Sequence, residues 1–246
     1  MRLTLLGTGA AGGVPLYGCQ CRACQRARDY PRYQRGPCSA LLEVGHKHYL
    51  LDAGLMDLDR RFPAQTLDAI FLTHFHPDHV QGLFHLRWGT GGHIPVYCPP
   101  DQEGCADLYK NPGILKFRAM QPFVREDMGN FYITPLPLIH SKLTFGYLFE
   151  SGHKRIAYLT DTKGLSREVL NCLHAGFIDL VVLDACTPPC VEHANHNSIK
   201  EAIALVDEIT PRKAILTHIN HDLDRWLLEK QPPIPQNVLI AEDEMP

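Results

Sequence analysis

Residues 73–79, Thr-His-Phe-His-Pro-Asp-His, constrain this chain more than any other stretch. They place three imidazoles and one carboxylate directly after the apolar run 69–72, which predicts a strand that ends in metal ligands. His74 and His76 alternate by two, so they point the same way from extended backbone. Asp78 and His79 follow a proline and belong to the turn into the next helix. Two adjacent groups of ligands suggest two adjacent metal ions, and the density of His and Asp argues against a chance cluster.

Several other buried strands along the chain also end in a residue that can bind a metal. Since open sheets carry their chemistry outside the strand ends, these residues are expected to meet at one edge. Strands arrive as hairpins in both halves of the chain, over 40–51 and 145–159, with helices between them. This order predicts an α/β fold with two packed mixed sheets flanked by helices, an αββα sandwich, in one domain over residues 1–246. The residues at the strand ends are Asp52, His74, His140, Asp161, Asp184 and His218.

Local patterns predict the remaining elements. We expect strands over 2–6, 94–98, 131–138 and 213–218, and an amphipathic helix over 198–209. We also expect a helix from Val80 to Trp88 and another that Asp101 caps and that ends near Tyr109. The stretch from Asn111 to Val124 has no clear period and is expected to be irregular.

Composition excludes several classes of protein. The chain has 246 residues, 45% hydrophobic and 21% charged, with a formal net charge of −3, so it lacks the basic footprint of a protein that grips long nucleic acid. The sequence has no run of eighteen apolar residues, so we expect no membrane span. The pattern at the N-terminus predicts a strand rather than a signal peptide. Nine cysteines, an odd number, favour reduced thiols in the cytoplasm over a disulfide framework.

Cys19, Cys21 and Cys24 lie within six residues and form a second candidate metal site. Three thiolates can hold one zinc ion and leave the fourth tetrahedral position to a distant ligand. Three buried structural cysteines are the alternative. Asp52, at a strand end, is expected to stand behind the metal centre and accept an N–H from a ligating imidazole.

Taken together, these motifs resemble the metallo-β-lactamase superfamily over most of the chain. The matching residues are His74-x-His76-x-Asp78-His79, then His140, Asp161 and His218, with 7–9 and 52–54 resembling the early motifs of that superfamily. Within it, the three-cysteine loop and residues 81–89 and 136–147 resemble the PhnP-like phosphodiesterases. That resemblance implies hydrolysis of 5-phosphoribosyl 1,2-cyclic phosphate to ribose 1,5-bisphosphate in phosphonate catabolism, the carbon–phosphorus lyase pathway.

The resemblance also implies how the ligands are shared. His74, His76 and His140 would hold one ion, Asp78, His79 and His218 the second, and Asp161 would bridge them. It favours manganese, with zinc as the competitor. Two ions roughly 3.5–4 Å apart can share a hydroxide that attacks phosphorus and can polarise a phosphoryl oxygen.

Further roles follow from the resemblance. His196, outside the ligand set and near the start of a helix, is expected to be the general acid, with His193 as a weaker competitor and a plain surface histidine as the alternative. His221 would complete a structural zinc site with Cys19, Cys21 and Cys24, inside an inserted loop at about 17–37. A homodimer is expected at the level of the family. Ser141, Lys142 and Thr144 are candidates for contacts with a second phosphate, with solvated loop residues as the alternative.

Two other functions fit parts of the pattern. A nuclease that trims tRNA 3′ ends would share the metal ligands, but it needs an RNA-holding arm or basic patch that the sequence does not suggest. A non-catalytic metal-binding scaffold would normally lose ligands, and all seven positions are filled here. We therefore expect a small cyclic sugar phosphate as the substrate and neither a membrane nor nucleic acid as the main partner.

Overall fold

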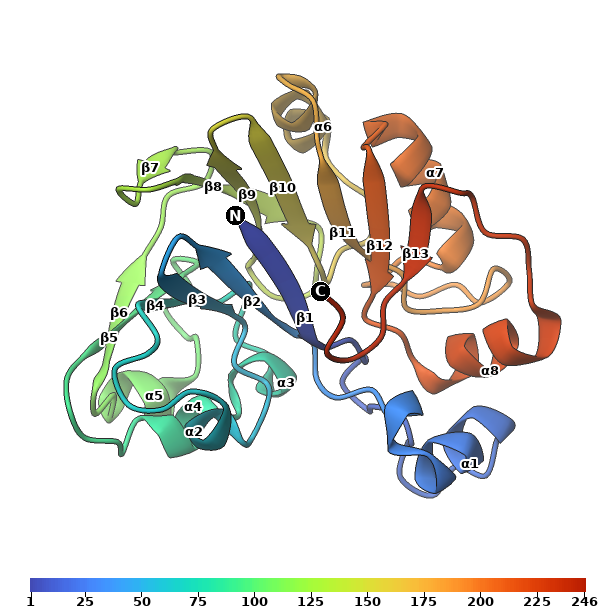
Figure 1. Cartoon of the computed structure of the whole chain (residues 1–246), viewed down its shortest axis with the longest axis horizontal. Helices are drawn as coiled ribbons and strands as arrows, with labels where there is room; N and C mark the ends of the chain where they lie inside the picture. Colours follow the sequence, from blue (N-terminus) through green and yellow to red (C-terminus); the bar gives the residue numbers. More distant parts are fainter.

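The computed structural model describes all 246 residues, and two β-sheets form its frame (Figure 1). Hairpins begin each sheet and parallel strands extend it. In spatial order the first sheet contains β1 (Arg2–Gly7), β2 (Ser39–Val44), β3 (Lys47–Leu51), β4 (Ala69–Phe71), β5 (Ile94–Cys98) and β6 (Leu115–Ala119). The second contains β13 (Val238–Ile240), β12 (Lys213–Thr217), β11 (Leu180–Asp184), β10 (Lys154–Leu159), β9 (Thr144–Ser151), β8 (Tyr132–Leu138) and β7 (Glu126–Asp127).

Side chains alternate between the two faces of each strand and so build separate layers. On β9, Tyr147 and Phe149 point between the sheets, where they meet Phe71 of the first sheet, whereas Leu148 points to the outer layer. The inner layer is rich in fully buried aromatic rings, and such rings bury the largest apolar area per side chain. Burial of this layer therefore holds the two sheets together.

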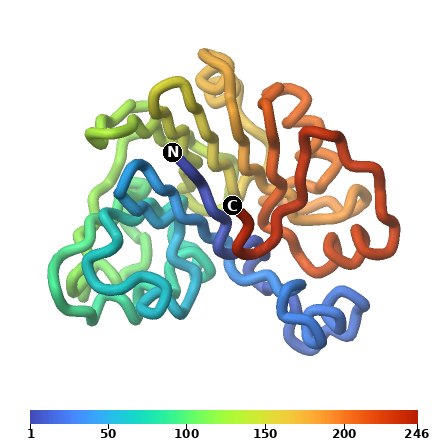
Figure 2. The backbone as a smooth tube through the Cα atoms, in the orientation of Figure 1, coloured from blue at the N-terminus to red at the C-terminus, as the bar shows by residue number.

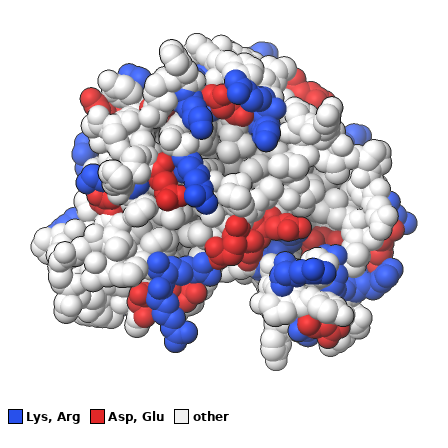
Figure 3. Space-filling view, viewed as in Figure 1, with Lys and Arg blue, Asp and Glu red and all other residues white.

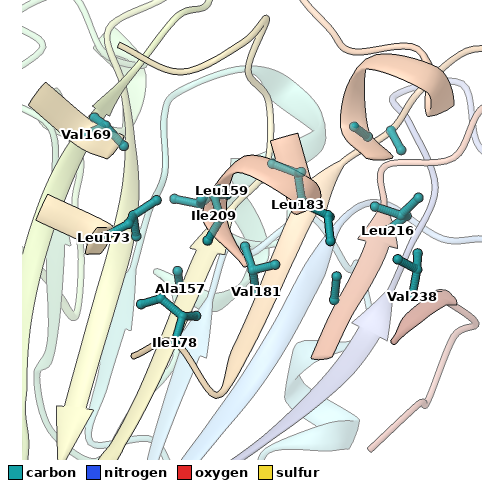
Figure 4. Packing of buried hydrophobic residues seen from close by; sticks show 14 of the residues in the cluster. Ala157, Leu159, Val169, Leu173, Ile178, Val181, Leu183, Ile209, Leu216 and Val238 are labelled. Carbon is teal, nitrogen blue, oxygen red and sulfur yellow. The ribbon is translucent and has the colours of Figure 1, made fainter. Parts of the chain in front are cut away.

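Helices cover the outer face of each sheet. The first sheet is covered by α2 (Leu58–Arg61), α3 (Pro77–Val80), α4 (Leu83–Leu86) and α5 (Ala106–Lys110). The second is covered by α6 (Arg167–His174), α7 (Ile199–Ile209) and α8 (His221–Lys230). In Figure 4, Val169 and Leu173 of α6 and Ile209 of α7 pack over the strands. The expected αββα sandwich is confirmed, and none of these helices is long and apolar enough to cross a membrane.

A helical arm stands out from the sandwich near the N-terminus (Figure 1). It contains α1 (Arg22–Asp29) and the 3₁₀ turn η1 (Pro31–Tyr33). Two arginines tie it to α8, since Arg26 and Arg35 lie 3.5 and 3.0 Å from the carboxylate of the nearly buried Asp224. The arm therefore packs on the helix that follows β12.

The C-terminal segment returns to the first strand, as Figure 2 shows. The Leu5 N–H donates to the Met245 carbonyl at 2.7 Å. The Asp243 carboxylate accepts from the N–H groups of Thr8 and Gly36 at 2.9 and 2.7 Å. These bonds fix the glycine-rich turn after β1 and the base of the arm.

Three local predictions were wrong. The helix expected over Val80–Trp88 is split into α3 and α4, because Ala53 takes the helical hydrogen bonds: its N–H donates to His79 and its carbonyl accepts from Gly82, both at 2.8 Å. The helix expected from Asp101 begins only at Ala106, since the Asp101 carboxylate accepts from the N–H groups of residues 103 and 104 and forms a turn. The stretch expected to be irregular contains β6, paired in parallel with β5.

Gly54 sits where two chain segments touch without room for a side chain. A Cβ there would lie 1.9 Å from the Asp78 carbonyl oxygen and 2.7 Å from the Pro37 Cβ. We predict that Gly54→Ala lowers the free energy of unfolding by about 1–3 kcal/mol and reduces metal content, because it displaces the loop that carries Asp78.

Urea unfolding followed by circular dichroism, with metal analysis, measures both effects. Gly176→Ala is the matched control, since the nearest atoms there belong to the flexible end of the Arg155 side chain and the change should stay near 0.5 kcal/mol. Equal stabilities of the two variants would contradict the packing argument.

Candidate active site

The loops that follow β3, β4, β8, β10, β11 and β12 meet at one edge of the sandwich, as expected from the strand ends. Three of them turn sharply, because Asp52, Asp161 and His218 have left-handed backbones with φ of 56°, 61° and 61°. Such a backbone costs a non-glycine residue about 1–3 kcal/mol and persists only where surrounding contacts hold it. Here it turns three ligand-type side chains inward within two residues of the ends of their strands.

Three imidazoles from two loops form the first cluster. His76 Nδ1 lies 2.8 Å from His74 Nε2 and 3.1 Å from His140 Nε2. The His140 Nδ1 lies 3.2 Å from the Asn195 carbonyl, which can only accept, so Nδ1 carries the proton and Nε2 presents a lone pair. Converging lone pairs repel one another, and a cation between them removes that repulsion.

Asp78, His79 and His218 form the second cluster. The His79 Nδ1 donates to the buried Asp52 carboxylate at 2.9 Å, so its Nε2 lone pair faces oxygens of Asp78 and Asp161 at 3.4 and 3.3 Å. That Nε2 and both ring nitrogens of His218 are buried without a hydrogen-bond partner. Buried polar atoms without partners are costly, and a bound metal ion would satisfy one nitrogen of each ring.

Asp161 lies between the clusters. Its carboxylate is 3.3 Å from His79 and His218 and 3.8–3.9 Å from His140 and His74. Burial alone would raise the pKa of Asp161, but His218 and His79 hold that pKa well below its ordinary value, so the group stays ionised. Two ligands of one tetrahedral ion stand about 3.4 Å apart, so these separations fit a shared pair of ions.

The arm carries a separate group of metal-ligand type. Cys19, Cys21, Cys24 and His221 bring their ligand atoms within 4.8 Å of one another, with His221 Nδ1 at 3.4 Å from Cys19 Sγ. Three N–H groups, from Leu16, Cys21 and Cys24, point at the sulfurs at 3.3–3.5 Å. Four side chains fill a tetrahedral coordination sphere, so these residues fit a closed structural site.

His196 lies beside the metal-ligand clusters and has a carboxylate partner. Its Nδ1 is 2.6 Å from Asp184, and its ring stacks on that of His218 at 4.5 Å between centroids. Burial raises the pKa of Asp184 well above its ordinary value and lowers the pKa of His196. Because Asp184 fixes the ring by Nδ1, the Nε2 of His196 is left free for a substrate.

Of the three residues expected to contact a second phosphate, one is not accessible to a ligand. Thr144 is buried and its hydroxyl donates to the Lys142 carbonyl at 2.9 Å, which leaves it no free contact with a ligand. The Lys142 ammonium lies 3.8 Å from the Asp101 carboxylate, and Ser141 is exposed. Only Ser141 and Lys142 therefore remain open to a ligand.

Asp52 lies behind His79, as expected, but sequence reasoning missed Thr73 and Asn197, which hold Asp52 and Asp184 in place. Thr73 donates its N–H and its hydroxyl to Asp52 at 2.8–3.0 Å, and its hydroxyl also lies 3.0 Å from His74 Nδ1. Asn197 donates to Asp184 and accepts from Gly164 across the loop. Because Thr73 directly precedes His74, its role beside the ligands could have been predicted from the sequence. Asn197 directly follows His196, but that position does not indicate that it bonds to Asp184.

Comparison with known proteins places this geometry in a family. Residues 48–219 match the beta-lactamase superfamily domain. The chain therefore belongs to that superfamily, in its metallo-β-lactamase branch. Within the superfamily it is related to the PhnP family: the crystal structure of a diphosphatase from that family has a TM-score of 0.83 at 25% identity, over 99% of this chain and 95% of that one.

Two relatives by sequence carry other names. An octanoyltransferase of Porphyromonas gingivalis is 30% identical over 95% of this chain and 49% of its own length. The chain thus spans about half of that relative. A ribonuclease Z of Picosynechococcus is 30% identical over 60% of this chain and 46% of its own length.

The cysteine cluster makes a prediction about metal content. We predict that Cys21→Ser loses about one zinc ion per chain and keeps any metal bound at the histidine clusters, because only the four-residue group on the arm and α8 loses a ligand. Metal analysis of the purified protein measures this. Cys190→Ser, at an exposed cysteine outside the cluster, is the control, and unchanged zinc in Cys21→Ser would refute the assignment.

Proposed function

We propose that the chain is a metal-dependent cyclic phosphodiesterase that hydrolyses 5-phosphoribosyl 1,2-cyclic phosphate to ribose 1,5-bisphosphate in phosphonate catabolism. The observation that carries the proposal is the pair His196–Asp184 at 2.6 Å, which adds an acid outside the ligand set and beside the clusters. Membership of a hydrolase superfamily and similarity to the PhnP-family diphosphatase support it.

We assign His74, His76 and His140 to one divalent ion and Asp78, His79 and His218 to the other, with Asp161 bridging. Manganese is favoured and zinc is the competitor, since imidazole and carboxylate suit both. When bound, the ions would supply an activated water and neutralise charge on the phosphoryl oxygens. Cys19, Cys21, Cys24 and His221 are assigned to one structural zinc ion.

The protein's own groups act on the leaving oxygen, on the side of the phosphorus opposite the attacking water. Hydrolysis adds water across one P–O bond of the ring, so the sugar oxygen that leaves needs a proton. We assign the donation of that proton to the His196 Nε2, and Asp184 holds the ring in position through Nδ1. Asp52 similarly orients His79, so that its Nε2 points at the centre.

Two observations favour other substrates of the same chemistry. The similar crystal structure is that of a diphosphatase, and a diphosphate would place its leaving phosphate where we place the sugar oxygen. The ribonuclease Z relative suggests RNA instead. Lysine and arginine alternate with acidic groups on the face in Figure 3, which offers no continuous basic surface for a phosphate backbone.

We further propose that the protein acts in the cytoplasm as a homodimer. All nine cysteines are unpaired, which suits the reducing cytoplasm. A homodimer is expected from the resemblance alone. A scaffold without catalysis is the alternative in a different class, and an assay decides it.

We predict that His196→Ala lowers kcat on 5-phosphoribosyl 1,2-cyclic phosphate by roughly 10²–10⁴-fold, because the leaving oxygen then departs without a proton donor. Turnover of the manganese- and zinc-loaded proteins on this substrate, a 2′,3′-cyclic nucleotide, a diphosphate and a tRNA precursor measures activity and its breadth.

His46→Ala, in the exposed turn between β2 and β3, is the matched control and should keep full activity. A fall of less than about threefold in His196→Ala with metals retained would exclude it as the acid. Activity of the wild-type protein on the diphosphate or the tRNA precursor alone would replace the proposed substrate, and no activity on any of them would favour the scaffold.

A further inference from the structure

The loop between β11 and α7 places a second histidine near the proposed acid. Asn195 connects it to the metal clusters: its carbonyl faces His140 Nδ1, and its N–H donates to His193 Nδ1, both at 3.2 Å. Because His193 Nδ1 accepts, the proton of the neutral ring is on Nε2. His193 therefore offers an N–H donor in a fixed tautomer.

Three histidine rings lead from the clusters to the surface. The ring of His196 is 4.5 Å from that of His218 and 4.8 Å from that of His193, between centroids. The side chains of His218 and His196 are 3% and 12% exposed, and His193 is exposed. His193 is thus the outermost of the three, next to the acid.

Two lysines on other loops of the site edge already lie near carboxylates. Lys163 on the neighbouring loop pairs with Glu201 at 2.7 Å, and Lys142 lies 3.8 Å from Asp101. Burial, then His196, then Lys163 lower the pKa of His193, which favours the neutral ring. An N–H donor in a fixed tautomer suits an oxygen of an anionic group.

We propose that His193 is a specificity-determining residue that hydrogen-bonds, through Nε2–H, a second phosphate carried by the leaving group of the substrate. The inference rests on the proposed function, since it takes His196 as the acid. The acid stands at the leaving oxygen, so the next ring outward contacts what lies beyond that oxygen. In a cyclic sugar phosphate that part is the sugar with its second phosphate.

The test compares two substrates, 5-phosphoribosyl 1,2-cyclic phosphate and ribose 1,2-cyclic phosphate, which lacks the second phosphate. In His193→Ala, kcat/KM should fall roughly 10- to 100-fold on the first, mainly through KM, and less than about threefold on the second. His193→Gln retains an N–H donor and should recover part of the loss. His153→Ala, in the exposed turn between β9 and β10, is the control.

Equal losses on both substrates, or no loss on either, would overturn the role of His193 while leaving the proposed function intact. A wild-type protein inactive on both cyclic substrates would instead overturn the proposed function, and this inference with it. Melting temperature and metal content of each variant show whether a loss comes from altered folding or altered metal binding.

Discussion

The buried carboxylate of Asp161 is the constraint on which the site depends. It follows β10 of the second sheet, yet His79 and His74, which follow β4 of the first sheet, lie within 3.9 Å of it. A charge so buried is tolerated only with partners around it, so both sheets must deliver their histidines to one point. The packing between the sheets is what fixes that point.

The arm also helps to hold His218, one of the residues around Asp161, in place. His218 and His221 are three residues apart, and the backbone between them is held on both sides: Ile219 exchanges hydrogen bonds with Thr8 and Ala10 of the glycine-rich turn at 2.9 and 3.1 Å. A zinc ion on Cys19, Cys21, Cys24 and His221 would clamp the arm to the start of α8. The strained backbone of His218 therefore lies between two rigid attachments.

Periodicity was enough to predict the sandwich and the residues that line its edge. The alternation on β9 and the spacing on α7 are local signals, and His74, His140, Asp161 and His218 each follow a strand that such signals reveal. Hydrogen bonds between residues distant in sequence determine features that local patterns did not predict. Ala53 splits the helix expected over Val80–Trp88, and Asp184 selects His196, because partners distant in sequence leave no local pattern. Helix α8 was also not predicted, although asparagine is a favoured N-cap residue and Asn220 caps this helix by accepting from the Leu223 N–H at 2.8 Å.

We propose that seven side chains from two sheets hold two ions beside one acid. Anomalous diffraction from crystals of the manganese-loaded protein, collected at the manganese and zinc edges, tests it most directly. We expect two manganese peaks roughly 3.5–4 Å apart near Asp161, and one zinc peak among Cys19, Cys21, Cys24 and His221. A single peak at the histidine clusters, or none, would contradict it.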